Sequence, residues 1–213
     1  MQLLFFFQKE GINLLKLHIS KGNQKMGAIP SVSLPSVATC RTCLCNSKCY
    51  AQKIERLRPN VAAAYQDNFR VFIEDPDRYW REVEAHVMLS HFFRFHVGGD
   101  IINFLYLTKM VGIAQRNPHC HILCFTKKDY LVNMYIRDFG DFPANLHVIL
   151  SAWEGLTLHN PYRLPEAHVV YKDGTSTTDE PAMICNGNCT ECAITHDRCW
   201  NLQKGEKIKF NEH

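Results

Sequence analysis

Eight of the ten cysteines in this chain of 213 residues fall into two groups whose spacing suits metal ligands. Thiolates are soft ligands, and several of them in a short loop bind zinc or an iron–sulfur cluster. We therefore expect metal binding at both ends of the chain. The first group comprises Cys40, Cys43, Cys45 and Cys49, and the second comprises Cys185, Cys189, Cys192 and Cys199.

The spacing in the first group suits an iron–sulfur cluster. A single residue separates Cys43 from Cys45, which is too tight for an ordinary zinc knuckle. Three ligands drawn from Cys40, Cys45 and Cys49 would leave one iron of a [4Fe–4S] cubane open to another ligand. A helix is expected to begin near Tyr50, and its N-terminus would stabilise the anionic thiolates.

The second group has the pattern Cys-x3-Cys-x2-Cys-x6-Cys, with Gly187 between its first two members. Asn186, Gly187 and Asn188 let the chain turn around a metal ion. This group predicts either a self-contained zinc or cluster site or a source of the fourth ligand for the first group. In the second case the C-terminal segment would close over the first cysteine loop.

The remaining two cysteines and most histidines have a structural interpretation. Cys120 and Cys124 share one face of a predicted strand, where a reduced cysteine behaves as a small apolar residue, so we expect both in the core. His96 precedes a Gly-Gly turn and is better placed for a site. His91 and His196 are expected to have structural roles.

The elements that must position these residues alternate between strands and helices. The centres of three predicted strands, Phe95, Ile122 and Ile149, are 27 residues apart each time. This period predicts βα units with parallel strands, in a partial barrel or an open, mostly parallel sheet. Strands are expected at 92–97, 120–125, 146–151 and, as the last one, 167–171, with helices at 101–115 and 128–139.

The first part of the chain leads into this α/β region. Helical spacing of apolar residues extends from Tyr50 to about Ile73, where Pro59 should divide it into two helices, and again from about Pro76 to Ser90. We expect one domain over 1–213. Its parts are a β or loop region at 1–39, the cysteine loop with helices at 40–91, βα units at 92–173 and a cysteine-rich metal-binding segment at 174–213.

Polar residues follow each predicted parallel strand, at the edge of the sheet where α/β proteins bind ligands. Glycines allow a ligand to approach the backbone closely, and the polar side chains could contact a small molecule. The predicted cofactor-binding residues are Gly98, Gly99, Asp100, Lys127, Ser151 and Glu154.

Composition and charge restrict the partners. The net charge is +3, and Lys and Arg are scattered, which argues against nucleic acid as a partner. The apolar run near the N-terminus is too short to span a bilayer and lacks the features of a secretory signal, so we expect a cytoplasmic chain without a membrane partner. Cytoplasmic thiols stay reduced, which favours metal binding over disulfides.

Segments such as FRFHVGGDI, VILSAWEG and the CYA at 49–51 resemble the phage gene-product-88-like proteins, which occur in bacteriophages and in prophage regions of bacteria. The resemblance runs from about residue 14 to the C-terminus and implies an origin in the cytoplasm of a bacterial host. It matches Cys40, Cys45 and Cys49 and leaves Cys43 as an extra cysteine. The segments are GNQKMGAIPSVSLPSVATC, CYA, LRPNVAAAYQDN, FRFHVGGDI, CFTK, VILSAWEG and the final CW.

A more distant similarity is to radical S-adenosylmethionine enzymes, which carry a three-cysteine loop, a Gly-Gly-acid turn and a partial βα barrel. It implies that the three matched cysteines hold a [4Fe–4S] cluster and that Gly98, Gly99 and Asp100 contact the methionine part of S-adenosylmethionine. The loop here reads Cys-x4-Cys-x3-Cys, whereas that family has Cys-x3-Cys-x2-Cys, a spacing found in this chain at 185–192.

Together these features predict an iron–sulfur protein with one or two clusters, acting with a small molecule or a reductant as its partner. A radical or other redox reaction is one hypothesis for its activity. The alternative is a zinc-stabilised binding module without catalysis, and association of such a module with nucleic acid ranks third.

Overall fold

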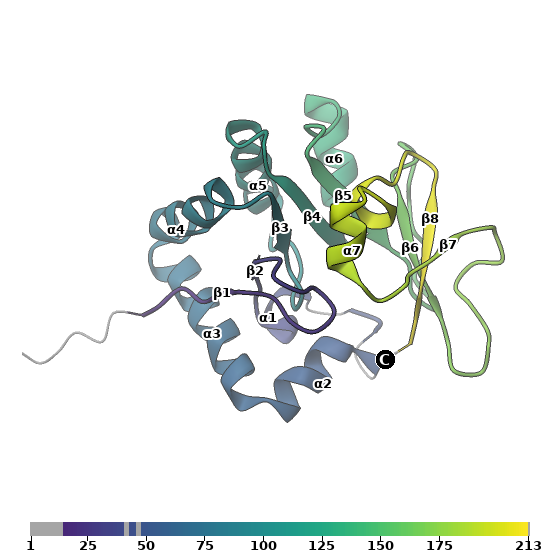
Figure 1. The fold of residues 1–213 in the computed structure, drawn as a ribbon, viewed down its shortest axis with the longest axis horizontal. Helices are drawn as coiled ribbons and strands as arrows, with labels where there is room; N and C mark the ends of the chain where they lie inside the picture. The colour runs from purple at the N-terminus through teal and green to yellow at the C-terminus, as the bar shows by residue number, and fades with distance from the viewer. Residues whose placement is uncertain (1–14, 41–42, 46–47, 213) are drawn as a thin grey trace, which may run out of the picture.

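An open β-sheet forms the centre of the molecule (Figure 1). The structure is a computed structural model that describes residues 15–40, 43–45 and 48–212, so the prediction for residues 1–14 lies outside it. The strands are β1 (Ile19–Ser20), β2 (Ser31–Val32), β3 (Phe92–Phe95), β4 (His121–Thr126), β5 (Leu146–Ser151), β6 (Glu166–Val170), β7 (Met183–Ile184) and β8 (Lys207–Asn211).

The order of these strands in the sheet is β1-β2-β3-β4-β5-β6-β8-β7. The β1–β2 pair is antiparallel, and the other described pairs are parallel. The prediction of an open, mostly parallel sheet is therefore confirmed. Within the described ranges the edge strands β1 and β7 do not pair, so the sheet does not close into a barrel.

Capping residues define the limits of the helices. Pro59 divides the first predicted helical stretch as expected, since α2 ends at Leu57 and α3 begins at the proline. The Asp75 side chain accepts a hydrogen bond from Arg78 N at 2.9 Å and caps α4. The helices are α1 (Ser36–Cys40), α2 (Tyr50–Leu57), α3 (Pro59–Glu74), α4 (Pro76–Met88), α5 (Phe104–Arg116), α6 (Asp129–Phe139), α7 (Cys189–Ile194) and the 3-10 helix η2 (Arg198–Trp200).

None of the helices in the described part of the chain is long and apolar enough to cross a membrane. Two βα units are present, β3–α5 and β4–α6, whereas no helix lies between β5 and β6. The prediction that the strand near 167–171 is the last one is wrong, because β7 and β8 follow it. Strand β8 lies between β6 and β7 and pairs in parallel with both.

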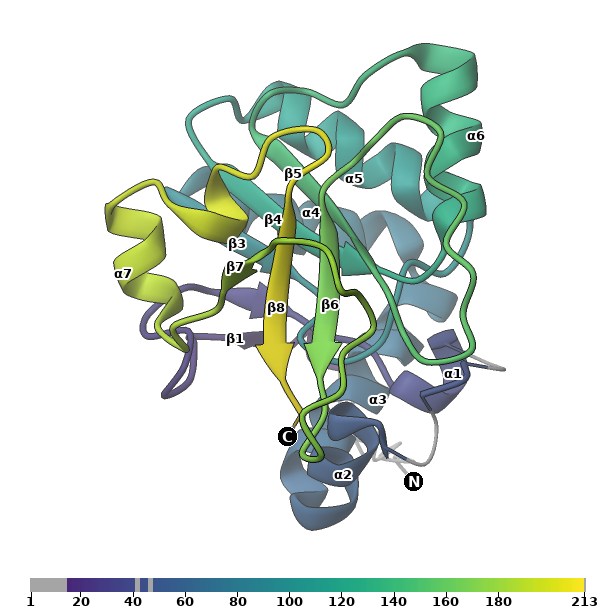
Figure 2. The ribbon, with the colours of Figure 1, turned by 90° about the vertical axis from the view of Figure 1, so that its right-hand side faces the viewer.

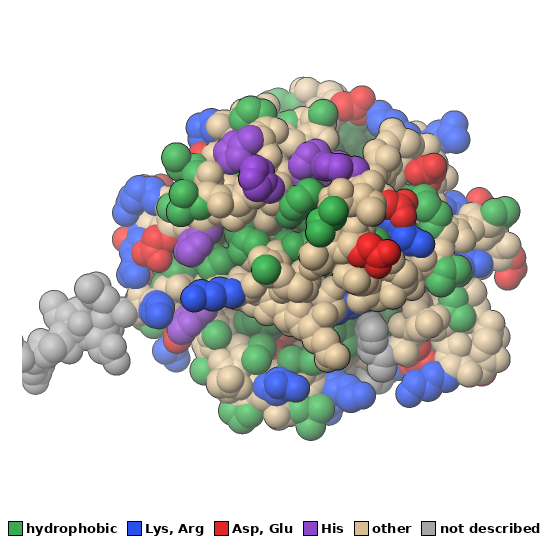
Figure 3. All heavy atoms as spheres, in the orientation of Figure 1, with side chains coloured by type: hydrophobic (Ala, Val, Ile, Leu, Met, Phe, Trp, Pro, Cys, Tyr) green, Lys and Arg blue, Asp and Glu red, His purple; other side chains and the backbone are tan. Residues whose placement is uncertain are grey.

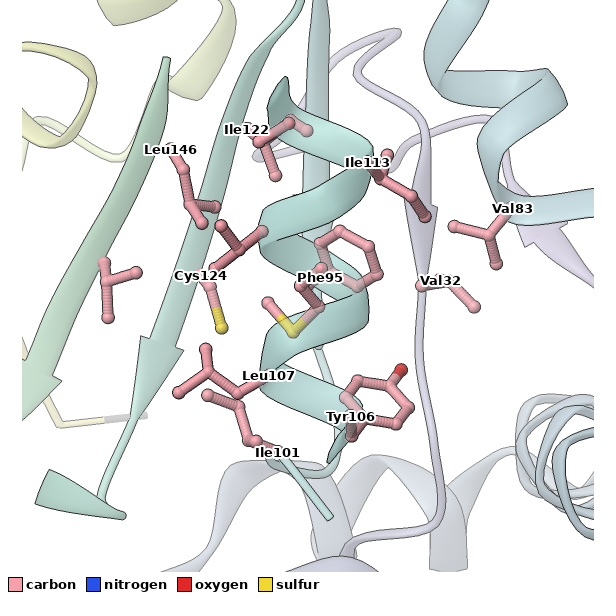
Figure 4. Packing of buried hydrophobic residues seen from close by; sticks show 14 of the residues in the cluster. Val32, Val83, Phe95, Ile101, Tyr106, Leu107, Ile113, Ile122, Cys124 and Leu146 are labelled. Carbon is pink, nitrogen blue, oxygen red and sulfur yellow. The ribbon is translucent and has the colours of Figure 1, made fainter. Parts of the chain in front are cut away.

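Helices α3 to α6 cover one face of the sheet, which we call the outer face (Figure 1). Every second side chain along the central strands points to this face and is buried there. Phe95, Ile122 and Cys124 point to this side, where they pack near Tyr106, Leu107 and Ile113 of α5 (Figure 4). Cys120 and Cys124 are fully buried in this core. The prediction that both cysteines serve core packing is therefore confirmed.

The inner face of the sheet is covered by the C-terminal segment that contains α7 and η2. Leu123, Ile149 and Ile208 from β4, β5 and β8 pack with Ala193 and Trp200 in a second core. Figures 1 and 2 show α7 on the opposite side of the sheet from α4 and α5. The second cysteine group therefore lies over the inner face.

A buried polar chain connects the outer core to the end of β3. Tyr79 and Tyr106 share a hydrogen bond of 2.6 Å between their hydroxyls, and His96 Nε2 lies 3.1 Å from the Tyr106 hydroxyl. Burial, followed by the charges of Lys128 and Arg94, lowers the pKa of His96 from 6.5 to about 3. His96 is therefore neutral in the folded protein at neutral pH.

This buried histidine predicts a loss of stability in mild acid. The unfolded chain protonates His96 below its ordinary pKa of 6.5, whereas the folded protein resists protonation down to about 3. The stability that His96 contributes is complete above pH 6.5 and is lost as the pH falls, by about 2 kcal/mol at about pH 5. The free energy of unfolding should therefore fall between pH 7 and pH 5 in the wild type. In the His96→Gln variant this fall should be smaller by the amount that His96 contributes.

Urea unfolding of the wild-type protein and of the His96→Gln variant at both pH values measures the effect. His147 shifts stability in the same direction, because burial lowers its pKa to about 4, so some pH dependence will remain in the variant. His91→Gln, at an exposed position, is the matched control and should leave the pH dependence unchanged. An identical pH dependence in His96→Gln and the wild type would contradict the prediction.

Candidate functional site

A cavity of about 490 Å³ lies at the inner face of the sheet and at the carboxyl ends of β3, β4 and β5. Helix α2 and the C-terminal segment provide its other walls. The two cysteine groups, which are far apart in the sequence, therefore line the same space. The lining cysteines are Cys40, Cys43, Cys45, Cys49, Cys185, Cys189, Cys192 and Cys199.

The C-terminal segment is attached to the loop between β1 and β2 by specific contacts. Cys189 N donates a hydrogen bond to Lys25 O at 2.9 Å, and Thr190 Oγ1 donates to Met26 O at 3.0 Å. A Cβ atom on Gly27 would lie 1.9 Å from Thr190 Oγ1, so only glycine allows this close approach. These contacts hold the second cysteine group at the cavity.

Three thiols of the first group lie together. Cys43 Sγ is 2.8 Å from Cys45 Sγ. Hydrogen bonding from the Cys45 thiol lowers the pKa of Cys43 and of Cys49 to about 6 each, while the pKa of Cys45 itself is raised. The backbone amides of Gln52 and Ala51 at the start of α2 act on Cys49 in the same direction. Cys43 therefore lies among the other thiols rather than apart from them.

Cys40 differs from these three thiols, since burial and the nearby Asp100 carboxylate raise its pKa to about 12. Lys127 provides the opposite charge. Burial acts to lower the pKa of Lys127, but the thiolates of Cys45 and Cys43 and the Asp100 carboxylate outweigh it and raise the pKa overall. The Lys127 ammonium therefore stays charged beside the thiols, with its Nζ 5.6 Å from the centre of the Trp153 ring.

Asp100 organises the ends of two strands. Its Oδ1 accepts hydrogen bonds from Ile101 N at 2.7 Å and from Thr126 Oγ1 at 2.6 Å, and its Oδ2 accepts from Lys127 N at 3.1 Å. The backbone N of Asp100 donates to Thr39 Oγ1 at 3.0 Å. This carboxylate therefore fixes the turn after β3 against β4 and α1.

The two glycines before Asp100 are required by packing within the protein. A Cβ atom on Gly98 would lie 2.6 Å from Tyr65 Cε2. Gly99 has a φ of +84°, and its Cβ atom would lie 2.7 Å from Leu34 O and 2.8 Å from Thr39 Oγ1. These contacts explain the Gly-Gly sequence by close approach of the chain to itself.

The predicted cofactor-binding residues divide into two sets. Gly99, Asp100, Lys127 and Ser151 line the cavity, whereas Gly98 and Glu154 are not among its described lining residues. Glu154 forms an ion pair of 3.6 Å with Lys48, in which both side chains are exposed.

The second cysteine group lies at the inner face beside Arg94 and Arg198. Burial, followed by the Cys185 thiolate, raises the pKa of Cys199 to about 12, and Cys189 and Cys192 act in the same direction. Cys192 Sγ accepts a hydrogen bond from Arg198 Nη1 at 3.9 Å. The four thiols are therefore close enough to influence one another electrostatically.

The donor chemistry of both groups fits a thiophilic metal or cluster. All ten cysteines are free thiols. Within the described ranges, no three Cys, His, Asp or Glu side chains already form the ligand set of a single ion. Thiolates of the first group beside a buried ammonium are nevertheless suited to an anionic iron–sulfur cluster.

Histidines form a further cluster at the amino ends of β4 and β5. His121 Nδ1 lies 3.3 Å from His147 Nε2, and the rings of His121 and His196 are 5.2 Å apart. Figure 3 shows histidine side chains gathered in the upper part of the view. His196 lies beside Phe92, consistent with the predicted structural role.

Three residues of the cavity wall were not among the predicted site residues. Arg94 lies on the inner face in the middle of an otherwise apolar strand, and a lone charge flanked by Phe93 and Phe95 was a usable signal. Trp153 and Trp200 add aromatic surface, which follows from the tertiary structure rather than from any local pattern.

The family model described as gene product 88 matches residues 8–204. No curated protein and no solved structure matches the chain.

The Gly-Gly turn gives a prediction about stability. Gly99→Ala should lower the free energy of unfolding by about 2–5 kcal/mol, since it combines a strained positive φ with a backbone clash. Gly174 has nearly the same φ, +85°, with no heavy atom within 4 Å of its Cβ position. Gly174→Ala should therefore cost only about 1–2 kcal/mol, the strain alone. Urea unfolding measures both, and equal losses would contradict the role assigned to the clash.

Proposed function

This chain belongs to the gene product 88 family. We propose that its cavity binds an iron–sulfur cluster together with a small organic molecule. One observation carries the proposal: two distant cysteine groups line the same cavity as the carboxyl ends of three neighbouring strands. Thiolates beside an open space at the ends of parallel strands suit a metal centre that acts on a bound ligand.

Cys40, Cys45 and Cys49 are the proposed cluster ligands in the first group. The lowered pKa of Cys49 favours its thiolate form at neutral pH, which is the form that binds metal. Lys127 balances part of the negative charge of the thiolates. A [4Fe–4S] cluster supplies single electrons when it is bound, so the proposed activity is redox chemistry, with a reaction of the radical S-adenosylmethionine type as its most specific form.

The second group is proposed to hold its own metal through Cys185, Cys189, Cys192 and Cys199. A set of four cysteines is a common ligand set for both zinc and iron–sulfur clusters. A zinc-stabilised module without catalysis is the second candidate function, and this four-cysteine composition favours it. Binding of either metal would draw the thiols into a complete coordination sphere, so that metal binding and local ordering are coupled.

The polar strand ends are proposed to contact the organic ligand. Gly99, Asp100, Lys127 and Ser151 line this part of the cavity. Because Thr126 and two backbone amides hold the Asp100 carboxylate, its position is fixed before a ligand enters. Trp153 covers Lys127 and keeps water from one side of its ammonium.

Metal analysis of anaerobically purified protein tests the proposal. The expected result is bound iron with an equal amount of acid-labile sulfide and broad visible absorption. If each group holds its own cluster, Cys45→Ser and Cys192→Ser should each remove about half of the iron, whereas a single shared cluster would be lost completely in both variants. Cys120→Ala, in the outer core, is the matched control and should retain all of the iron.

A colourless protein with stoichiometric zinc and no labile sulfide would refute the iron–sulfur proposal and support the zinc module. Cys43→Ser tests the ligand assignment in the same assay. Full iron content in this variant is expected, because the assigned ligands are the other three cysteines. A loss equal to that of Cys45→Ser would overturn the assignment.

The cofactor part of the proposal has its own measurement. Calorimetry of the iron-loaded protein with S-adenosylmethionine should show binding, and the Cys45→Ser variant should show none, because an open iron of the cluster is the proposed contact. The absence of heat with the loaded wild-type protein would exclude S-adenosylmethionine as the organic ligand.

A further inference from the structure

The guanidinium of Arg94 occupies an unusual position in the wall of the cavity. Arg94 lies in the middle of β3 with Leu123 of β4 as its register partner, and both residues line the cavity. Its Cζ atom lies 5.0 Å from the centre of the Phe125 ring. Arg94 is only partly exposed. Its planar guanidinium therefore lies against the Phe125 ring instead of extending into solvent.

This guanidinium has no polar partner among the described residues. Arg94 Nε is fully shielded and donates no hydrogen bond. Other arginines form ion pairs at short distance, with Arg78 on Glu82, Arg116 on Glu84 and Arg198 on Asp197. Most buried side-chain donors in proteins have a partner, so we interpret an arginine that lines a cavity without an ion pair as a binding group for a molecule that enters the cavity.

Neither of the two acidic side chains of the wall forms an ion pair with Arg94 in the described part of the chain. Asp100 already accepts three hydrogen bonds, and Glu212 accepts one from Lys172 N. Six basic and two acidic residues line the cavity in the described part of the chain. The basic residues are Lys25, Lys48, Lys53, Arg94, Lys127 and Arg198, and the acidic ones are Asp100 and Glu212.

Aromatic rings lie against two of these basic residues. Lys25 lies over Phe210, with its Nζ 5.1 Å from the ring centre, in the same way that Arg94 lies over Phe125. Trp153 and Trp200 add further apolar surface to the wall. A ligand that satisfies this wall needs an anionic group for the guanidinium and an apolar or aromatic body for the rings.

We propose that the cavity is a binding site for an organic oxyanion, a molecule that carries a carboxylate or phosphate group on an apolar body, and that Arg94 binds the oxyanion. The planar guanidinium donates two parallel hydrogen bonds to either group. This inference names the class of organic ligand for the cavity of the proposed function, and the anion site itself needs no metal.

A different role for Arg94 would be to offset the thiolate charge of the second cysteine group. After burial, which raises the pKa of Cys189 and Cys199, Arg94 acts on both thiols in the opposite direction. In that role Arg94 would control metal content and would not discriminate between charged and neutral ligands. An Arg94 variant would therefore lose anion binding in the first role and metal content in the second.

Three small probes test the proposal by calorimetry on the purified full-length protein: benzoate, phenyl phosphate and the uncharged benzamide. Benzoate or phenyl phosphate should bind the wild-type protein, and the stronger of the two identifies the anionic group. Arg94→Gln should weaken that binding by about 10- to 100-fold, the effect of losing a charge-assisted pair of hydrogen bonds, and Arg94→Lys should retain part of it.

Arg70→Gln is the matched control, since it removes an exposed arginine from α3, and it should bind the probes like the wild type. Binding of benzamide should be weak and equal in all variants. Without ligand, Arg94→Gln should unfold at the same or a higher temperature than the wild type, because it removes a shielded charge without a partner. This thermal result shows that lost probe binding is not lost folding.

Failure of both anions to bind the wild-type protein would overturn the inference, as would equal binding by Arg94→Gln and the wild type. Loss of iron in Arg94→Gln with unchanged anion binding would assign Arg94 to the second cysteine group instead. Iron and sulfide are measured in the same preparations. The oxyanion site and the iron–sulfur cluster are therefore tested independently of each other. Anion binding through Arg94 in a protein without iron would support the oxyanion site and refute the cluster.

Discussion

The pairing of β8 between β6 and β7 is the interaction on which the candidate site depends. Five residues of β8 pair in parallel with β6, and the segment that connects β7 to β8 crosses the inner face of the sheet with α7 and η2. Without this pairing the second cysteine group would have no fixed position, and the cavity would lose one of its walls. A short strand in the last part of the chain therefore determines whether two sequence-distant sets of thiols share one space.

Local sequence patterns predicted the elements of the βα region because the strands there are apolar runs, and β3 and β4 are each followed by an amphipathic helix. The predicted strand at 146–151 matches β5, and Pro59 divides α2 from α3 as expected. Strand β8 was missed, although Ile208 and Phe210 alternate with Lys207 and Lys209 in the manner of a strand with one buried face. Its place between β6 and β7 depends on long-range pairing, which no local pattern contains.

Within the candidate site, residue type was easier to predict than role. The cysteines and the polar strand ends were identified by their spacing, and most of them line the cavity. The Gly-Gly sequence was interpreted as room for a ligand, whereas the positions of Tyr65 and Leu34 account for both glycines. Cys43, which remains a predicted extra cysteine, contacts Cys45. Such contacts depend on side chains that meet only in the folded chain, so spacing alone could not assign them.

The position of β8 in the chain also has a consequence for assembly. The ribosome releases the first cysteine loop and the central strands before the residues that form β8, and domains can begin to fold during synthesis. The inner face remains uncovered until β8 joins the sheet. A metal delivered early would meet the first cysteine loop on an open sheet, whereas a metal delivered late would have to enter past α7. If the proposed metal binds, the order of the elements along the chain therefore decides whether it meets an open or a covered inner face.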